Sequence, residues 1–272
     1  MTAAPEVCVV HLVWAPLGTG ALERFLASYA AQPAGLAHRL VVILKGFEAS
    51  EDAAAHVELL AGLEHETLLY TRPTFDLPAY AAAAETFEAR RYCFLNSESV
   101  LLAPGWLAAL SDALAQPGVG VVGATGSYET PDSIFPWRRK RWPRFPNPHL
   151  RTNAFMLSRE LMLSGSWPEI PTKAQAWELE SGFRGVTRHA WGQGLETRVV
   201  GRDGTAYRPH EWPGSATFRS GGQANLLVAD NRTREWDDAA PAQQAELSRR
   251  AWGPDPAAAA AEVQRAIAAS TA

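Results

Sequence analysis

The 272-residue sequence has few cysteines and no long apolar run. Its two cysteines, Cys8 and Cys93, lie in short apolar segments without a second cysteine or a histidine at metal-ligand spacing. We therefore expect buried, reduced thiols rather than a disulfide or a metal site. No segment approaches the roughly 18 apolar residues of a membrane-spanning helix. The first residues also lack a basic segment followed by a cleavable apolar segment, so the sequence predicts a cytoplasmic protein.

Basic charge is not in excess either. The chain has 25 Lys and Arg residues against 29 Asp and Glu residues, a formal net charge of -4, which argues against a nucleic-acid-binding protein. With 47% hydrophobic residues it can bury a sizeable core. Its length fits one α/β domain, expected at 1–238, followed by an Ala-rich helical C-terminal extension at 239–272.

Strand-like and helix-like segments alternate through the first 125 residues. Near-continuous apolar runs predict strands covered on both faces, and the segments between them predict helices. The alternation predicts an α/β fold with a mostly parallel sheet flanked by helices and right-handed crossovers. The expected strands are 7–13, 39–44, 67–70, 92–95 and 119–122, and the expected helices are 21–31, 52–63, 77–90 and 104–115.

Functional residues of such a sheet follow the carboxyl ends of its strands. We expect them at 14–17, 46, 72–76, 96–99 and 125–128. Beyond residue 126 the pattern changes. The sequence there predicts a long loop at 131–149, a strand at 153–157, a partly helical segment at 173–192, short strands and turns at 197–234, and peripheral helices from about 239. The Gly-x-Gly-x-x-Gly pattern at 118–123 runs through a predicted strand instead of following one, so it does not indicate a dinucleotide site.

A polar cluster, Asn96-Ser97-Glu98-Ser99, follows the predicted strand at 92–95, and Pro-Gly-Trp-Leu then begins a helix. The cluster could bind a ligand at the strand end, or it could form a hydrogen-bonded turn that caps the next helix.

The segment YCFLNSESVLLAPGWLAAL resembles the part of GT-A-fold glycosyltransferases that holds an Asp-x-Asp motif before Pro-Gly-Trp-Leu. The resemblance covers residues 7 to 195 and is closest to family 2-like bacterial transferases that build surface polysaccharides. It implies a GT-A-like, Rossmann-like fold and a nucleotide-sugar donor bound by Asn96 and Ser97. It also implies Glu98 as a metal ligand, with Mg²⁺ or Mn²⁺ an optional cofactor because Asn96 replaces the first aspartate. The implied acceptor is a glycan or a lipid-linked saccharide.

The same resemblance places other residues near the donor. The opening run VCVVHLVWAPLG implies a base contact at Pro16, and RPTFDLPAYAAAAE implies donor contacts from Asp76 and Tyr80. Asp76 is equally suited to be the N-cap of the following helix. A late histidine completes the metal site in many of these enzymes, which implies His210 as a second ligand. A structural role for this lone histidine stays open.

An acidic pair near a later helix is the catalytic candidate. These enzymes often use one such carboxylate as general base on the acceptor hydroxyl, and Glu178 and Glu180 are the nearest match. Because they are two residues apart, they cannot share one face of a helix, and Glu180 before Ser-Gly is the expected base. A solvated surface role is the alternative. Arg151 and Asn153 alternate with His149 along an extended chain, so they could project together toward a donor diphosphate or an anionic sugar.

The segment 137–144 carries five cations and no acid. It could be a solvated loop, bind an anionic acceptor, or contact anionic headgroups on the inner face of the membrane. The negative net charge of the chain argues against nucleic acid as the partner. The function expected is therefore sugar transfer from a nucleotide-sugar to a glycan or lipid-linked acceptor. The alternative is a catalytically lapsed GT-A domain that binds nucleotide or glycan, or scaffolds a partner enzyme.

Overall fold

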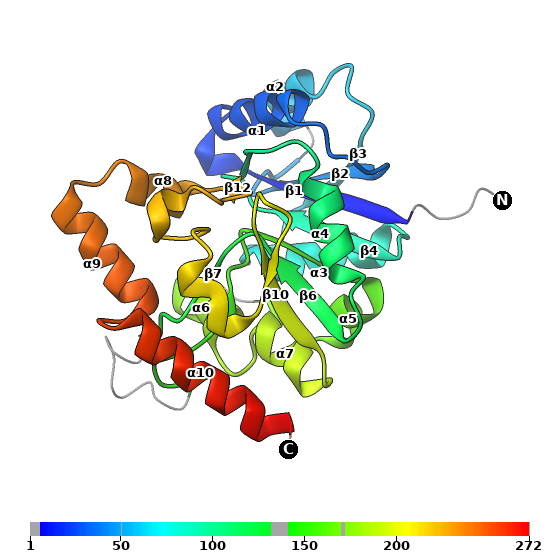
Figure 1. Ribbon diagram of the computed structural model, residues 1–272. Coiled ribbons are helices and arrows are strands. Elements are labelled where there is room, and N and C mark those ends of the chain that lie inside the picture. Colours follow the sequence, from blue (N-terminus) through cyan, green and yellow to red (C-terminus); the bar gives the residue numbers. More distant parts are fainter. Residues whose placement is uncertain (1–5, 50, 132–140, 170–171, 272) are drawn as a thin grey trace.

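The central feature of the computed structural model is a large sheet with helices on both faces (Figure 1). The structure describes residues 6–49, 51–131, 141–169 and 172–271. Within these residues the main sheet has the strand order β11–β10–β6–β9–β4–β1–β2–β3. Its strands are β1 Val7–Trp14, β2 Arg39–Lys45, β3 Glu66–Tyr70, β4 Arg91–Leu95, β6 Val119–Gly123, β9 Ala154–Ser158, β10 Glu196–Val200 and β11 Ala206–Tyr207.

Most neighbouring strands of this sheet are parallel, which confirms the predicted fold class. β1 pairs in parallel with β2 and β4, β2 with β3, and β6 with β10. β9 runs antiparallel between β4 and β6, with Leu95 opposite Ala154. Because of this direction, the residues before β9 lie at the same edge as the residues that follow β4. That edge is the one where ligands bind in open α/β sheets.

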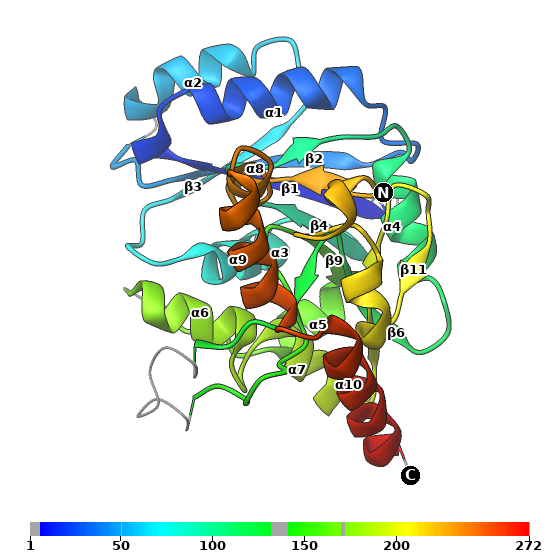
Figure 2. The same ribbon diagram turned by 60° about the vertical axis from the view of Figure 1, so that its left-hand side comes forward.

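The helices divide into two layers (Figure 2). Each face of the sheet packs on its own hydrophobic cluster, and alternate residues of β1 belong to the two clusters. None of the helices in the described ranges is both long and apolar enough to cross a bilayer. On one face lie α1 Gly20–Ala31, α2 Ala54–Leu59 and α4 Trp106–Leu114, and on the other lie α3 Asp76–Thr86, α5 Arg159–Ser164, α6 Lys173–Ser181 and α7 Val186–Gly192.

The two cysteines are free and buried, as the sequence predicted. Both belong to the core strands β1 and β4. Burial raises the pKa of the Cys8 thiol to about 12, so the group stays protonated at neutral pH.

The C-terminal helices are α8 Asn231–Asp237, α9 Pro241–Trp252 and α10 Pro256–Thr271. The sequence predicted peripheral helices from about 239 onward, and α9 and α10 pack their inner faces against the core. Trp252 is 2% exposed, and its indole N–H donates to the carbonyl of Phe218 at 2.9 Å. Val263 of α10 is equally buried. The extension therefore helps to close the core along one side of the molecule (Figure 1).

His11 in β1 is a buried ionisable group without a compensating contact. Its ring stacks on Phe25 at 3.7 Å between centroids, and neither ring nitrogen has a hydrogen-bond partner among the described residues. Burial lowers the pKa of His11 from 6.5 to about 3. The unfolded chain takes up a proton near pH 6.5, whereas the folded chain does not until far lower pH. Stability from this site is therefore complete above pH 6.5 and falls as the pH drops toward 3.

Replacing His11 with leucine removes this titration at similar side-chain volume. Between pH 6.5 and pH 5 we expect the wild-type free energy of unfolding to fall by about 2 kcal/mol more than that of His11→Leu, because one pKa unit corresponds to about 1.4 kcal/mol. Urea unfolding at the two pH values measures both losses. Equal losses in the two proteins would show that His11 does not titrate in this way.

Candidate functional site

The turn after β4 is held by a local hydrogen-bond network. The Asn96 side-chain oxygen accepts from the backbone N–H of Glu98 at 3.1 Å and from the Ser99 hydroxyl at 3.0 Å. The backbone N–H of Asn96 donates to the carbonyl of Asn153 at 2.8 Å. Ser97 is 8% exposed. The expected hydrogen-bonded turn is therefore present, but it does not cap the next helix, whose N-cap is Gly105 with φ 72°.

This turn presents Glu98 to two arginines from distant parts of the chain. Arg24 of α1 donates to the Glu98 carboxylate at 3.1 Å. Arg234 of α8 also pairs with that carboxylate, and its Nη1 donates to the Glu98 carbonyl at 3.1 Å. The Glu98 side chain is 18% exposed. The carboxylate at the position of the Asp-x-Asp motif is thus engaged by cations of the chain itself.

Arg151 and Asn153 lie together at the same edge, since both contact Thr125. The Thr125 hydroxyl donates to the Asn153 side-chain oxygen at 2.7 Å and accepts from Arg151 at 3.4 Å. Arg151 also donates to Asp230 at 2.7 Å, in an ion pair whose side chains are 12% and 1% exposed. The Asn153 Nδ2 is buried and has no partner among the described residues. This buried amide group is therefore an unsatisfied donor next to Arg151.

Asp230 joins this ion pair to α8. Its carboxylate caps the helix by accepting from the backbone N–H groups of Arg232 and Thr233 at 3.0 and 2.9 Å. Burial alone would raise the pKa of Asp230, but Arg151 and these N–H donors outweigh burial and hold the pKa below its usual value. Burial would likewise lower the pKa of Arg151, and Asp230 and Glu180 raise it. Both groups are charged at neutral pH.

Glu178 and Glu180 point in different directions from α6. Glu180 Oε1 accepts from the backbone N–H of Thr152 at 2.9 Å and from its hydroxyl at 3.3 Å, next to Arg151. Glu178 instead pairs with Arg141 at 3.8 Å. Among the described residues no hydrogen bond reaches Glu180 Oε2.

His149 lies in the short strand β8 His149–Leu150, which pairs with β7 Gly126–Ser127. Its Nδ1 bonds the carbonyl of Asn147 at 2.9 Å, and the side chain is 6% exposed. Burial lowers the pKa of His149, and the nearby charge of Glu180 acts in the opposite direction. His149 thus lies inside the site, close to Glu180, as a group that burial keeps neutral.

The loop after the 3₁₀ helix η5 Pro209–Gly214 adds a second buried arginine, Arg219. Phe218 lies between two guanidiniums, with Arg151 at 4.4 Å and Arg219 at 4.9 Å from its ring centroid. Three non-glycine residues of this loop have positive φ: Ala216 at 54°, Arg219 at 48° and Gln223 at 50°. Each such conformation costs about 1–2 kcal/mol. The Gln223 side chain maintains the loop by bonding the Arg219 backbone N–H and the Thr233 carbonyl.

Asp76 lies at the other end of the edge, near β1 and β2. The expectation that it caps its helix is wrong. The N-cap is Phe75, and Asp76 is the first residue of α3 and makes no cap bond. Its carboxylate pairs with the buried Lys45 Nζ at 3.3 Å, and Lys45 also lies 5.9 Å from the ring centroid of Trp14. Pro16 is exposed in the 3₁₀ turn Ala15–Leu17, which follows Trp14.

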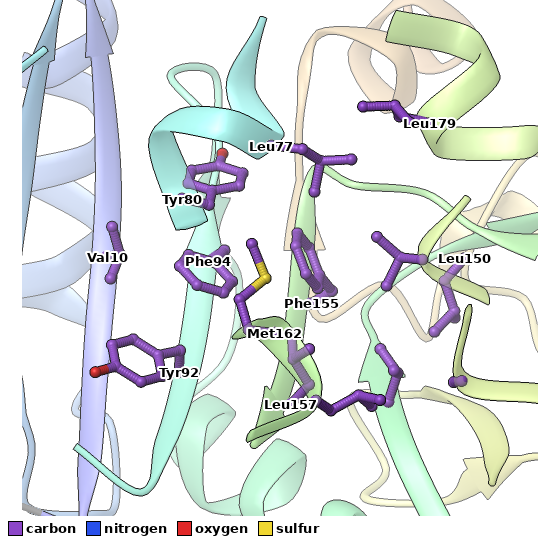
Figure 3. Close-up of a cluster of buried hydrophobic side chains, with 14 of the residues drawn as sticks. Val10, Leu77, Tyr80, Tyr92, Phe94, Leu150, Phe155, Leu157, Met162 and Leu179 are labelled. Atoms are coloured by element: carbon purple, nitrogen blue, oxygen red, sulfur yellow. The ribbon is translucent and has the colours of Figure 1, made fainter. Parts of the chain in front are cut away.

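Tyr80 does not reach this edge. Its side chain is 0% exposed and stacks on Phe94 at 4.7 Å between ring centroids, within the core cluster of Figure 3. Helical geometry places it one turn beyond Asp76, where α3 faces the sheet. The hydroxyl has no partner among the described residues, and burial raises the pKa of Tyr80 well above its ordinary value. In this arrangement the side chain offers no surface to a donor.

His210 lies apart from the turn after β4. It belongs to the 3₁₀ helix η5 Pro209–Gly214 and lines a cleft of about 820 Å³ with residues of α7, β10 and α10. That cleft includes neither Glu98 nor Arg151 nor Glu180. In the described ranges no three His, Cys, Asp or Glu side chains group together as metal ligands would. His210 and Glu98 therefore do not build the predicted metal site between them.

The residues at the Asp-x-Asp position do not fit a divalent cation. Mg²⁺ and Mn²⁺ favour several oxygen ligands in octahedral geometry. Here the Asn96 oxygen already accepts two hydrogen bonds, and Glu98 is bound by two guanidiniums. A cation at Glu98 would lie beside two positive charges.

The basic segment 137–144 is only partly described. Residues 137–140, which carry three of its cations, lie outside the described residues, so the expected contact with an anionic acceptor or membrane falls largely on them. Of the rest, Arg141 pairs with Glu178, and Trp142 is 1% exposed. Trp142 is therefore a core residue and not a membrane contact.

Sequence reasoning missed Asp230, Arg24 and Arg234 as members of the site. Asp230 had a usable signal, because Asp-x-x-Thr before a helix is a capping pattern, and Thr233 does bond back to the Asp230 N–H at 2.8 Å. Arg24 and Arg234 had no such sequence signal, because they contact Glu98 from positions 74 and 136 residues away in the chain.

Comparison with known proteins identifies the fold. No family model and no curated protein matches the sequence. Among solved structures, a mannosyltransferase from Pyrobaculum calidifontis in complex with GDP-Man and Mn²⁺ superposes with a TM-score of 0.50 at 17% identity, over 98% of this chain and 76% of that chain.

Two other glycosyltransferases match less well. Glucosyl-3-phosphoglycerate synthase from Mycobacterium tuberculosis, in complex with Mn²⁺, UDP and phosphoglyceric acid, has a TM-score of 0.42 and 15% identity over 69% of this chain and 62% of that chain. Mouse xyloside xylosyltransferase 1 has a TM-score of 0.43 and 11% identity over 72% of this chain and 85% of that chain. The likeness to the mannosyltransferase shows that this chain has a GT-A-like fold.

Proposed function

We propose that the protein is a glycosyltransferase that moves a sugar from a nucleotide-sugar donor to an acceptor hydroxyl. One observation carries the proposal. On a GT-A-like fold, Glu180, Arg151 and the turn at Asn96 meet at the edge where open α/β sheets bind ligands. These groups supply a carboxylate base, a cation and a rigid turn, which are the parts that sugar transfer from a diphosphate needs.

In the proposed reaction the acceptor oxygen attacks the anomeric carbon of the donor sugar. The acceptor proton passes to Glu180 Oε2, while Thr152 holds Oε1 in place. The bond between the anomeric carbon and the phosphate oxygen breaks, and its electron pair leaves with the nucleoside diphosphate. Attack opposite to the leaving group inverts the anomeric centre. Asp76, Lys45 and Trp14 lie at the far end of the edge, where a base and ribose could be held.

The acceptor in this proposal is a glycan or lipid-linked saccharide of surface-polysaccharide synthesis. The support for this finer assignment is the sequence resemblance to family 2-like transferases.

Donor binding tests the proposal. We expect calorimetry of the full chain with UDP-, GDP-, dTDP- and CMP-sugars to show binding of at least one donor, followed by slow donor hydrolysis or transfer. Binding by none of them contradicts the proposal. Binding without any hydrolysis or transfer favours the second candidate, a lapsed domain that only binds nucleotide. The observation behind that candidate is the ion-paired Glu98, which departs from an acidic Asp-x-Asp site.

A further inference from the structure

The position of Arg234 beside Glu98 is built by backbone contacts. The two-residue strand β12 Val228–Ala229 pairs with β5 Val100–Leu101, so the chain entering α8 lies against the chain leaving the Asn96 turn. The Ser28 hydroxyl of α1 accepts from the backbone N–H of Leu101 at 3.1 Å. The segments that carry Arg24, Glu98 and Arg234 are thus tied to one another independently of their ion pairs. Figure 1 shows α8 and β12 close to α1.

The ion pairs around α8 contain more cations than anions. Glu98 is shared by Arg24 and Arg234, and Glu235 by Arg219 and Arg232. Asp230 pairs with Arg151 alone. Asp237, a further acid on α8, bonds the amide of Gln223 at 2.7 Å. Even when this acid is counted, arginines outnumber carboxylates in the network. Glu180 and Glu129, whose charges also act on Arg151, offset this excess, so the cations open to a ligand beside Glu98 are the partly exposed Arg24 and Arg234.

The two arginines on Glu98 keep donors for another ligand. Among the described residues Arg24 bonds only through Nη2, and Arg234 only through its two Nη groups to Glu98. A guanidinium has five N–H groups. The side chains of Arg24 and Arg234 are 50% and 33% exposed, so phosphate oxygens can reach them.

From these observations we infer that Arg24 and Arg234, positioned by Glu98, form a cation-independent binding site for the donor diphosphate. This inference rests on the proposed function and specifies how its leaving group is bound. Glu98 acts as a positioning residue that holds the two guanidiniums at the end of β4. The guanidiniums donate hydrogen bonds to the diphosphate oxygens, and this geometry suits arginine better than lysine. The charge that a divalent ion would supply is provided by side chains.

The inference is tested by titrating the full chain with UDP, GDP and pyrophosphate, in EDTA and in Mn²⁺. We expect the tightest-binding nucleoside diphosphate to have dissociation constants in the two solutions that agree within about threefold. Pyrophosphate should compete with it in EDTA. Binding that appears only with Mn²⁺ overturns the inference and leaves the proposed function standing. Absence of nucleotide binding in both solutions overturns the proposed function and the inference together.

Arginine variants test the residues themselves. Arg234→Gln and Arg24→Gln should each weaken nucleoside diphosphate binding in EDTA, by about tenfold or more for Arg234, because each removes charge-assisted hydrogen bonds. Arg250→Gln is the matched control, since Arg250 is 57% exposed on α9 and pairs only with Glu246 among the described residues. Thermal unfolding checks that each variant is folded. If Arg234→Gln does not fold, the surface variant Arg24→Gln decides. Affinities equal to that of Arg250→Gln overturn the inference.

Glu98→Gln separates the two roles of Glu98. A metal ligand would lose binding in Mn²⁺ when its charge is removed. If Glu98 is a positioning residue, the glutamine amide oxygen still accepts from both guanidiniums while the negative charge that competes with the diphosphate is gone, so we expect binding in EDTA to be at least as tight as in the wild-type protein. A loss of more than about tenfold in EDTA contradicts the inference.

Discussion

Glu180→Gln is expected to reduce turnover by about 100-fold or more while donor binding stays within about threefold of wild type. Glutamine has the size of glutamate, and its amide oxygen can still accept both bonds from Thr152. It cannot take up the acceptor proton at neutral pH. Single-turnover transfer and donor titration, measured on the same preparation, separate the chemical step from binding.

Glu178→Gln is the matched comparison for this variant. It makes the same change two residues earlier on α6, at a carboxylate that pairs with Arg141 and not with Thr152. We expect its turnover to exceed that of Glu180→Gln by at least about tenfold. If Glu178→Gln shows the greater loss, the base is Glu178. If turnover is unchanged in Glu180→Gln, Glu180 is not the base.

The sheet could be predicted because buried parallel strands have a recognisable sequence pattern. β1 is buried on both faces, so its residues form a near-continuous apolar run, and β2 and β4 do the same. β9 is equally apolar, and the sequence predicted it as a strand. Its antiparallel direction leaves no such record, because direction depends on the path of the chain between β6 and β9. That direction is what brings Asn153 beside Asn96.

The C-terminal half of the site could not be predicted in the same way. α8 reads NRTREWD, which has no apolar face, and the sequence predicted turns there. Its stability comes from the Asp230 cap and from ion pairs with residues of distant elements. No local pattern encodes such pairs. In contrast, helical geometry alone predicts that the side chains of Glu178 and Glu180 point in different directions. Their different partners, Arg141 and Thr152, agree with this prediction.

Asp76 and Tyr80 show how a small shift changes a residue's role. The sequence predicted a helix beginning at Leu77 with Asp76 as cap, and α3 in fact begins at Asp76. Asp76 is thereby free to pair with Lys45, whose position at the end of β2 gave no sign of a partner 31 residues away. Tyr80 fits the core because Phe94 and Phe155 offer it aromatic contacts. Sequence similarity to a donor-binding segment does not show whether a residue faces the ligand edge or the core.

Among the variants proposed here, Asp230→Ala is expected to lower the free energy of unfolding most, by about 3–5 kcal/mol, because it removes the carboxylate that the buried Arg151 guanidinium contacts. It also removes the cap of α8. For a domain of this size the melting temperature should fall by about 10 °C. Calorimetric melting and urea unfolding measure the two quantities. Arg151→Met in the Asp230→Ala background removes the unpaired charge and should recover part of the loss.

Asp255→Ala separates the contribution of the cap from that of the charge. Asp255 also caps a helix, since its carboxylate accepts from the Ala258 N–H at 3.0 Å, but it is exposed and contacts no cation among the described residues. Its loss should be about 1 kcal/mol, the usual contribution of an N-cap. The excess loss in Asp230→Ala then measures the cost of the unpaired Arg151. If both variants lose about 1 kcal/mol, the charge of Arg151 is solvated by water or moves to another partner. The contribution of Asp230 to stability is then only that of the α8 cap.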